Sequence, residues 1–159
     1  MPIRQGRRQD AIAILKADHK KVKELFAQAG EVGERASAAR AKIFKEIDRE
    51  LTVHTMVEET IFYPAFRAKT KNWSEERDEV LEAYEEHAGA KELIAKLERL
   101  DPKDESYKAK LNVLCEQVLH HAREEESTMF PMARKLMSDD ELAELGEQIM
   151  AKKEEQQAA

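Results

Sequence analysis

Two segments of the chain carry histidine and glutamate in the same pattern. Residues 54 to 64 read HTMVEETIFYP, and residues 121 to 131 read HAREEESTMFP. The segments align without a gap. His54, Glu58, Glu59 and Pro64 correspond to His121, Glu125, Glu126 and Pro131. In a helix, residues four apart lie on one face, so each segment presents an imidazole and a carboxylate side by side. Such a pair can bind a metal ion.

The preceding part of each half repeats as well. Nearly the same shift brings Asp18-His19 to within one residue of Glu86-His87. The chain is therefore predicted to be two helical hairpins in tandem. Each supplies a lone His on its first helix and a His-x-x-x-Glu on its second. The candidate site residues are His19, His54, Glu58, His87, His121 and Glu125.

Helical elements must position these residues. Apolar residues recur at helical spacing, and Asp10, Ser74 and Ser138 are suited to cap the helices that follow them. We expect helices over residues 11–29, 37–69, 74–100, 105–137 and 139–155. The fold class predicted is all-α, an up-down-up-down four-helix bundle with a short C-terminal fifth helix. The expected organisation is an N-terminal tail (1–9), the bundle (10–137) and a C-terminal helix and tail (138–159).

Composition narrows the functional class. At 159 residues and 42% hydrophobic content the chain suits one domain. The net charge of -6 argues against a nucleic-acid surface, and no apolar run is long enough to span or anchor in a membrane, so a cytoplasmic protein is expected. The single Cys115 excludes an internal disulfide and a zinc site built mainly of thiolates, and is expected to be a small buried hydrophobe.

Helical spacing places the candidate residues within the apolar stripes. His54 and Glu58 continue the stripe of Ile47 and Leu51, so the pair points inward. Buried ionised carboxylates must be protonated, salt-bridged or bound to metal. Four imidazoles and two carboxylates are too many for one tetrahedral zinc but suit two octahedral ions. We predict a dinuclear non-haem iron centre, with manganese or zinc less specifically matched. A single such His, taken alone, would be interpreted as a core histidine.

The order His19, His54-x-x-x-Glu58, His87, His121-x-x-x-Glu125, each Glu followed by an aromatic residue and a proline, resembles the hemerythrin HHE cation-binding family over about residues 10–137. The resemblance implies two iron ions, oxo- or hydroxo-bridged. The four histidines would be terminal ligands and the two glutamates bridging carboxylates. His120 and Glu124 form a second His-x-x-x-Glu, but the distance to Pro131 selects His121, and His120 is expected to face solvent or a neighbouring helix.

One ligand of the oxygen-carrying hemerythrins is missing. Their third helix carries His-x-x-x-His, whereas Ala83 and Lys91 stand four residues before and after His87. This departure disfavours reversible oxygen carriage and leaves room for another ligand. Two interpretations of Tyr84 and Tyr63 stay open: one of them supplies an oxygen ligand, or both are aromatic side chains of the bundle with a polar tip.

Prolines follow both glutamates inside a predicted helix. Pro64 and Pro131 cannot donate a backbone hydrogen bond, which would release the carbonyls of Thr60 and Ser127. We expect a kink there that widens the bundle beside the site.

Three functional classes are compatible with this pattern. The first is a diiron protein that binds or reacts with dioxygen, hydrogen peroxide or nitric oxide, with catalase-like or other oxidoreductase activity left open. The second is an iron- or oxygen-sensing or iron-handling module whose fifth helix is the output. The third is a metal-free helical interaction protein. A ferritin-like enzyme is disfavoured, because no acidic residue precedes these histidines by three positions.

Overall fold

Every regular element in the computed structural model, which describes residues 9–158, is helical. The all-α class is therefore confirmed. The tail expected before residue 10 falls, apart from residue 9, outside the described residues. The elements are α1 (Ala11–Glu31), α2 (Ser37–Val57), η1 (Glu58–Phe62), α3 (Tyr63–Ala68), α4 (Glu75–Arg99), α5 (Tyr107–Glu124), η2 (Glu125–Met129), α6 (Phe130–Leu136) and α7 (Asp139–Ala158).

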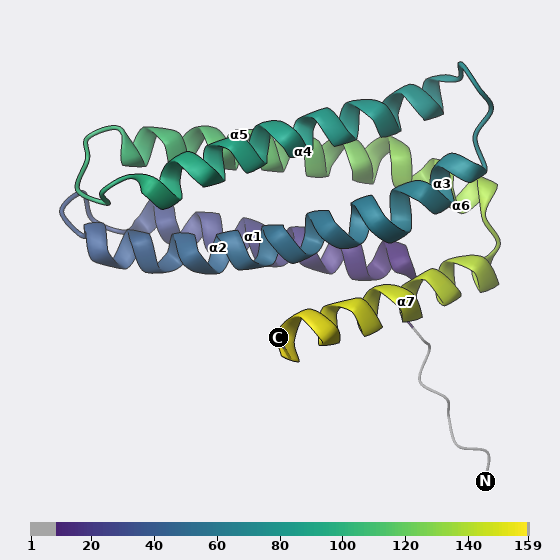
Figure 1. Ribbon diagram of the computed structural model, residues 1–159, viewed down its shortest axis with the longest axis horizontal. Coiled ribbons are helices and arrows are strands. Elements are labelled where there is room, and N and C mark those ends of the chain that lie inside the picture. Colours follow the sequence, from purple (N-terminus) through teal and green to yellow (C-terminus); the bar gives the residue numbers. More distant parts are fainter. Residues whose placement is uncertain (1–8, 159) are drawn as a thin grey trace, which may run out of the picture.

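The helices lie in two layers with a fifth helix outside them (Figure 1). α1 and α2 form one layer and α4 and α5 the other, and the α1–α2 and α4–α5 turns lie at the same end. α7 runs along the outside of the first layer, where it contacts α1 and α2. Consecutive helices therefore pack as hairpins, as the internal repeat predicts.

Side-chain caps begin three of the helices as expected. Asp10 accepts a hydrogen bond from the Ala13 backbone N–H at 2.8 Å, and Ser74 accepts one from Arg77 at 3.3 Å. At α7 the Ser138 hydroxyl accepts from the Glu141 N–H at 3.1 Å, and Glu141 reaches back to Ser138. These contacts satisfy backbone donors that a helix start leaves unpaired.

The two longest predicted helices are interrupted. Instead of continuous helices over 37–69 and 105–137, the chain forms a π-helical turn in each, η1 and η2, with a short α-helix after it. Each π turn begins at a candidate glutamate and ends just before the segment's proline. The expectation of a simple proline kink was thus incomplete, because the π-helical turn before each proline also holds about one residue more than an α-helical turn.

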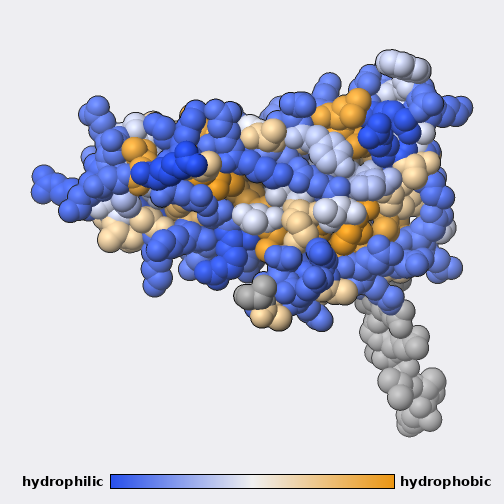
Figure 2. Space-filling view, in the orientation of Figure 1, coloured by the Kyte–Doolittle hydropathy of each residue, from blue (hydrophilic) through white to orange (hydrophobic). Residues whose placement is uncertain are grey.

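Two apolar clusters fill the interior. One surrounds Leu15, Phe62 and Phe130 and includes the buried face of α7, and the other surrounds Val22, Leu51 and Leu111 at the opposite end. The candidate histidines occur between these clusters along their helices. Cys115 is half-buried beside the second cluster rather than fully buried. The surface is mostly hydrophilic, with hydrophobic side chains showing between the helices (Figure 2).

None of the helices formed by residues 9–158 combines the length and the apolar character that crossing a bilayer requires.

Candidate metal centre

All six candidate residues meet in the interior. They come from α1, α2, η1, α4, α5 and η2, so every long helix of the two layers contributes. Their donor atoms form two groups within which all atoms lie inside 4.8 Å of one another. We call His19 and His54, with both glutamates, the first half-site; His87 and His121, with Glu58, form the second half-site.

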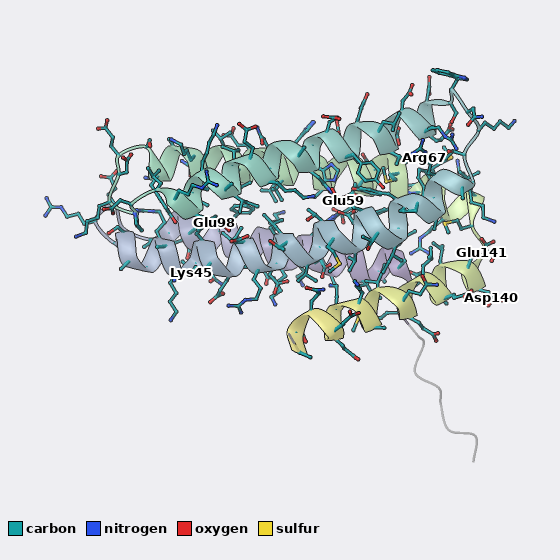
Figure 3. The ribbon with its side chains drawn as sticks, in the orientation of Figure 1. Lys45, Glu59, Arg67, Glu98, Asp140 and Glu141 are labelled. Carbon is teal, nitrogen blue, oxygen red and sulfur yellow. The ribbon has the colours of Figure 1, made fainter. Side chains whose placement is uncertain are left out.

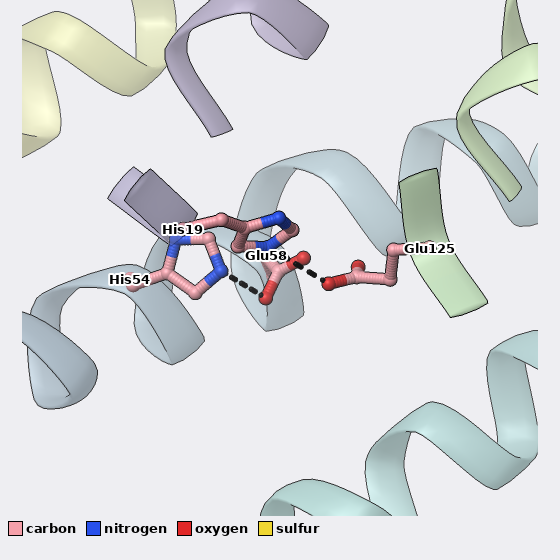
Figure 4. Close-up of side chains that lie close together, drawn as sticks. All are labelled: His19, His54, Glu58 and Glu125. Carbon is pink, nitrogen blue, oxygen red and sulfur yellow. Dashed lines mark ion pairs between the residues drawn. The ribbon is translucent and has the colours of Figure 1, made fainter. Parts of the chain in front are cut away.

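Each glutamate reaches both half-sites. Glu58 Oε1 lies 2.8 Å from His54 Nε2 and 3.3 Å from His87 Nε2. Glu125 Oε1 lies 3.2 Å from His19 Nε2 and 3.2 Å from His121 Nε2. Figure 4 shows the first half-site, in which the two carboxylates approach the imidazoles of His19 and His54. Each carboxylate therefore contacts one histidine of each half-site.

The outer ring nitrogen of every histidine faces a further carboxylate. In each hairpin, the residue preceding the first-helix His lies against the second-helix His. The residue following each candidate glutamate contacts the first-helix His of the other hairpin. We call these four the outer carboxylates; their distances to Nδ1 are Asp18–His54 2.9 Å, Glu86–His121 3.3 Å, Glu59–His87 3.2 Å and Glu126–His19 3.7 Å.

Two of these contacts are hydrogen bonds, between Asp18 and His54 Nδ1 and between Glu59 and His87 Nδ1, whereas Glu86 and Glu126 lie only at ion-pair distance from their histidines. A carboxylate that accepts the Nδ1 proton leaves Nε2 free to bind a cation, and it makes the imidazole more basic. The sequence pattern predicted no role for Asp18 or Glu86. The signal that would have found them is their place directly before a repeated His.

The π turns explain a further residue in the centre. In η1 the Tyr63 N–H donates to the Glu58 carbonyl five residues back, which returns Tyr63 to nearly the same face as Glu58. The fully buried Tyr63 hydroxyl donates to Glu125 Oε2 at 2.9 Å, and it lies 3.2 Å from His87 Nε2 and 3.1 Å from His121 Nε2. It therefore belongs to the second half-site.

The second half carries a phenylalanine at the corresponding position. The Phe130 N–H donates to the Glu125 carbonyl through η2, and its ring stacks on His19 with centroids 5.7 Å apart. The two half-sites thus differ in one hydroxyl group. That hydroxyl lies on the side of the centre where the repeat lacks a third histidine ligand.

The structure gives Tyr84 and Lys91 supporting positions. The Tyr84 hydroxyl donates a hydrogen bond to the Glu59 backbone carbonyl at 3.2 Å. In a continuing π-helix the N–H of residue 64 would bind that carbonyl, but Pro64 has no N–H. Lys91 binds both oxygens of Glu59 at 2.9 and 2.7 Å, and Glu59 lies between the two layers in Figure 3. Ala83 is buried and His120 is exposed, where it pairs with Glu124 at 3.0 Å.

Buried charge dominates the electrostatics. Burial alone would lower the pKa of His54, but the carboxylates of Glu58 and Asp18 outweigh it and raise the pKa to about 10. The pKa of His121 is likewise raised to about 11 by Glu125 and Glu86 against the effect of burial. Burial raises the pKa of the Glu58 carboxyl, yet His54 and other partners hold it well below its usual range. Protons on the imidazoles balance the carboxylates when no cation does.

Several buried atoms of the centre fit a metal ion. Within residues 9–158, the following lack a hydrogen-bond partner, although most lie at ion-pair distance from an opposite charge: His19 Nδ1 and Nε2, His54 Nε2, Glu58 Oε1 and Oε2, His121 Nδ1 and Glu125 Oε1. Buried polar atoms are otherwise almost always hydrogen-bonded. Imidazole and carboxylate donors converging without such partners are the donor set of a divalent cation site.

A large cavity opens beside these residues. It has a volume of about 800 Å³ and is lined by all four candidate histidines. Its remaining walls include the apolar side chains of Val22, Leu51, Ile94 and Val118. A molecule the size of dioxygen or hydrogen peroxide can therefore reach the centre from outside.

Comparison with known proteins agrees with this geometry. Residues 10–133 match the hemerythrin HHE cation-binding domain. The chain is 29% identical over 147 residues to the uncharacterized protein Rv2633c of Mycobacterium tuberculosis, covering 92% of this chain and 86% of that one. A crystal structure of a hemerythrin HHE cation-binding domain-containing protein from Mycobacterium kansasii superimposes with a TM-score of 0.79 at 28% identity, covering 94% of this chain and 88% of that one.

A longer relative shares the domain. The chain is 26% identical over 140 residues to a DNA nickase from Nostoc sp., which covers 88% of this chain but only 38% of the nickase. The family match spans most of the chain and includes all six candidate residues. The chain therefore belongs to the hemerythrin HHE cation-binding family.

Proposed function

We propose that the centre holds two iron ions, one in each half-site, and that it reacts with small oxidants. The observation that carries this proposal is that Glu58 and Glu125 each contact a histidine of both half-sites. The ligands would be His19, His54, His87, His121 and the two glutamates. Imidazole and carboxylate donors without thiolate favour iron. The arrangement of α1, α2, α4 and α5 that we propose is the up-down-up-down bundle, supported by their packing as two hairpins.

Two iron ions would supply the pair of electrons that reduces dioxygen or hydrogen peroxide. The chain's own groups prepare the site for that chemistry. Asp18 and Glu59 hydrogen-bond Nδ1 of His54 and His87 and so leave Nε2 of these rings facing the centre, and the π turn η1 brings Glu58 and Tyr63 to nearly the same helix face. Burial and the nearby Glu58 and Glu125 carboxylates raise the pKa of Tyr63 well above its usual value, so its hydroxyl keeps its proton.

Dioxygen, hydrogen peroxide and nitric oxide are the ligands that we propose. The cavity admits molecules of this size, and the second half-site has a tyrosine hydroxyl in place of a third histidine. A hydroxyl that keeps its proton can donate a hydrogen bond to a small oxidant beside the centre. We therefore expect reaction with peroxide rather than reversible oxygen carriage.

We propose no nucleic-acid partner. The chain aligns with only 38% of the nickase, and its net charge is -6. Nucleic-acid binding surfaces carry a clustered excess of Lys and Arg.

A second candidate function is an iron- or oxygen-sensing module. It is favoured by one contact: α7, which lies outside the family match, reaches the centre through Lys153. In this alternative the ions bind without turnover, and α7 transmits their presence.

Anaerobic loading followed by oxidant titration distinguishes these functions. Iron-loaded, reduced protein is mixed with dioxygen, hydrogen peroxide or nitric oxide and followed by absorption, with zinc-loaded protein as the control. We expect rapid oxidation by peroxide and no oxygen adduct that is released under vacuum. We also expect repeated turnover of added peroxide, in which a second peroxide molecule returns two electrons and is released as dioxygen. A stable, releasable oxygen adduct that ignores peroxide would replace this proposal with oxygen carriage. An iron-loaded protein inert to all three would favour iron sensing, and one that responds to dioxygen without consuming peroxide repeatedly would favour oxygen sensing.

A further inference from the structure

α7 lies beyond the residues that match the family, yet it packs directly on the bundle. Its buried face comprises Leu142, Leu145, Gly146 and Ile149. A Cβ added at Gly146 would lie 2.5 Å from the Gln9 carbonyl oxygen and 3.1 Å from the Ala11 nitrogen. The backbone of α7 therefore sits against the start of α1 with no room for a side chain between them.

One lysine of α7 turns from solvent toward the metal centre. Lys153 Nζ binds Asp18 Oδ1, and its side chain is 17% exposed. The neighbouring Lys152 side chain is 35% exposed and, among residues 9–158, forms an ion pair only within its own helix, with Glu155 at 3.7 Å. Lys153 is thus the lysine of this pair that crosses to α1.

Asp18 links this lysine to a candidate ligand. Its other oxygen, Oδ2, lies 2.9 Å from His54 Nδ1, and His54 Nε2 lies 2.8 Å from Glu58 Oε1. A continuous series of polar side-chain contacts therefore connects α7 with the inside of the first half-site. A buried carboxylate needs opposite charge and hydrogen bonds on both oxygens, and Lys153 supplies these on the oxygen that His54 does not contact.

The other outer carboxylates have no such connection to α7. Glu59 is held by Lys91 of α4, within the bundle. Within residues 9–158, no Lys or Arg ion pair is found for Glu86 or Glu126. The second half-site is therefore complete without α7, whereas the support of the first includes it.

We propose that Lys153 is a positioning residue of the first half-site, and that a metal ion there and the docking of α7 stabilise each other. The inference rests on the proposed function only in taking His54 as a metal ligand. Supports of metal-bound histidines typically change metal affinity by about 10- to 100-fold. Coupling between two binding events is reciprocal, so the metal should also hold α7 more firmly.

The test compares Lys153→Met with Lys152→Met in the full chain, because the two lysines are adjacent and differ in their contacts. Zinc binding to metal-free protein is measured by competition with a chromophoric chelator. We expect Lys153→Met to weaken one of the two ions by about 10- to 100-fold and leave the other unchanged. Lys152→Met should match the unaltered protein, and Lys153→Arg should restore most of the affinity.

Hydrogen exchange of the second half of α7 supplies an independent readout. We expect zinc to slow exchange there in the unaltered protein and in Lys152→Met, but much less in Lys153→Met. Asp18→Asn should behave as Lys153→Met, and combining the two changes should add little, which distinguishes positioning from a general loss of folding.

The outcomes separate the two proposals. If the unaltered protein binds no zinc or iron at the centre, the proposed function fails. If it binds two ions but Lys153→Met retains both affinities and the metal-dependent protection of α7, the positioning role is overturned and the proposed function stands.

Discussion

Each half-site has two histidines and contacts both glutamates, but the surroundings of the two differ. In the first, Phe130 stacks on His19, and the outer carboxylate of His54 is held by Lys153 from α7. In the second, Tyr63 places a hydroxyl between His87 and His121. Duplication thus repeats the ligands, whereas the Tyr63–Phe130 difference at equivalent positions and the contact from the additional helix α7 separate the two halves chemically.

This difference indicates a division of roles. The first half-site is enclosed by an aromatic ring and tied to an extra helix, so we expect it to hold its ion firmly. The second has a tyrosine hydroxyl and lacks one histidine of the oxygen carriers, so we expect the exchange of small ligands there.

Removing the shared carboxylate should abolish both half-sites. Glu58 contacts His54 in one and His87 in the other, so Glu58→Gln is expected to lower iron content from about two ions per chain to well below one. Metal analysis after anaerobic loading measures this. Glu124→Gln is the matched control, because Glu124 is exposed and pairs with His120, and it should keep both ions. Full iron content in Glu58→Gln would show that the half-sites do not depend on this carboxylate.

Removing one histidine should empty one half-site only. His54→Ala and His121→Ala are each expected to leave about one ion and to lower stability. A lost ion whose free concentration is about 100 times its Kd removes about 2.7 kcal/mol of unfolding free energy. Iron analysis and urea denaturation measure the two effects together. His120→Ala should change neither, and the register on α5 is wrong if it loses iron while His121→Ala retains it.

Metal-free protein should lose stability as the pH rises. The pKa values of His54 and His121 are raised from 6.5 to about 10 and about 11, so the stability they contribute is fully present below pH 6.5 and lost as the pH rises through those values. Urea denaturation with a chelator, from about pH 7 to about pH 9.5, should give a falling free energy of unfolding. The double variant His54→Gln/His121→Gln should fall less steeply. Constant or rising stability in the unaltered protein would contradict these protonation states.

Converting the second half-site to resemble the first should alter ligand exchange without losing iron. Tyr63→Phe is expected to keep about two ions, change the affinity of the oxidised form for azide and remove any tyrosine-to-iron absorption band. Tyr84→Phe is the control, since that hydroxyl binds a backbone carbonyl instead. If the band survives Tyr63→Phe and disappears in Tyr84→Phe, the oxygen comes from Tyr84 and our assignment to Tyr63 is wrong.

The meeting of the six candidate residues could be predicted because it depends on helical period and repetition. Residues four apart must share a helix face, and the second copy of the pattern made coincidence improbable. The all-α class followed from the same periodicity, and the capping residues Asp10, Ser74 and Ser138 marked true helix starts.

The surroundings of the centre could not be predicted in the same way. Tyr63 enters the centre only because η1 has a π turn, and an α-helical projection from Glu58 turns that side chain elsewhere. Asp18 and Glu86 contact a histidine of the other helix in their hairpin, which depends on the relative rotation of two helices. Lys153 has no counterpart in the repeat, since α7 follows both copies.

Anomalous scattering at the iron absorption edge, from crystals of iron-loaded protein, tests the central claim most directly. We predict two peaks, one contacted by His19 and His54 and the other by His87 and His121, with Glu58 and Glu125 reaching both. A single peak, or two peaks that share no glutamate, would contradict a two-iron centre divided between these half-sites.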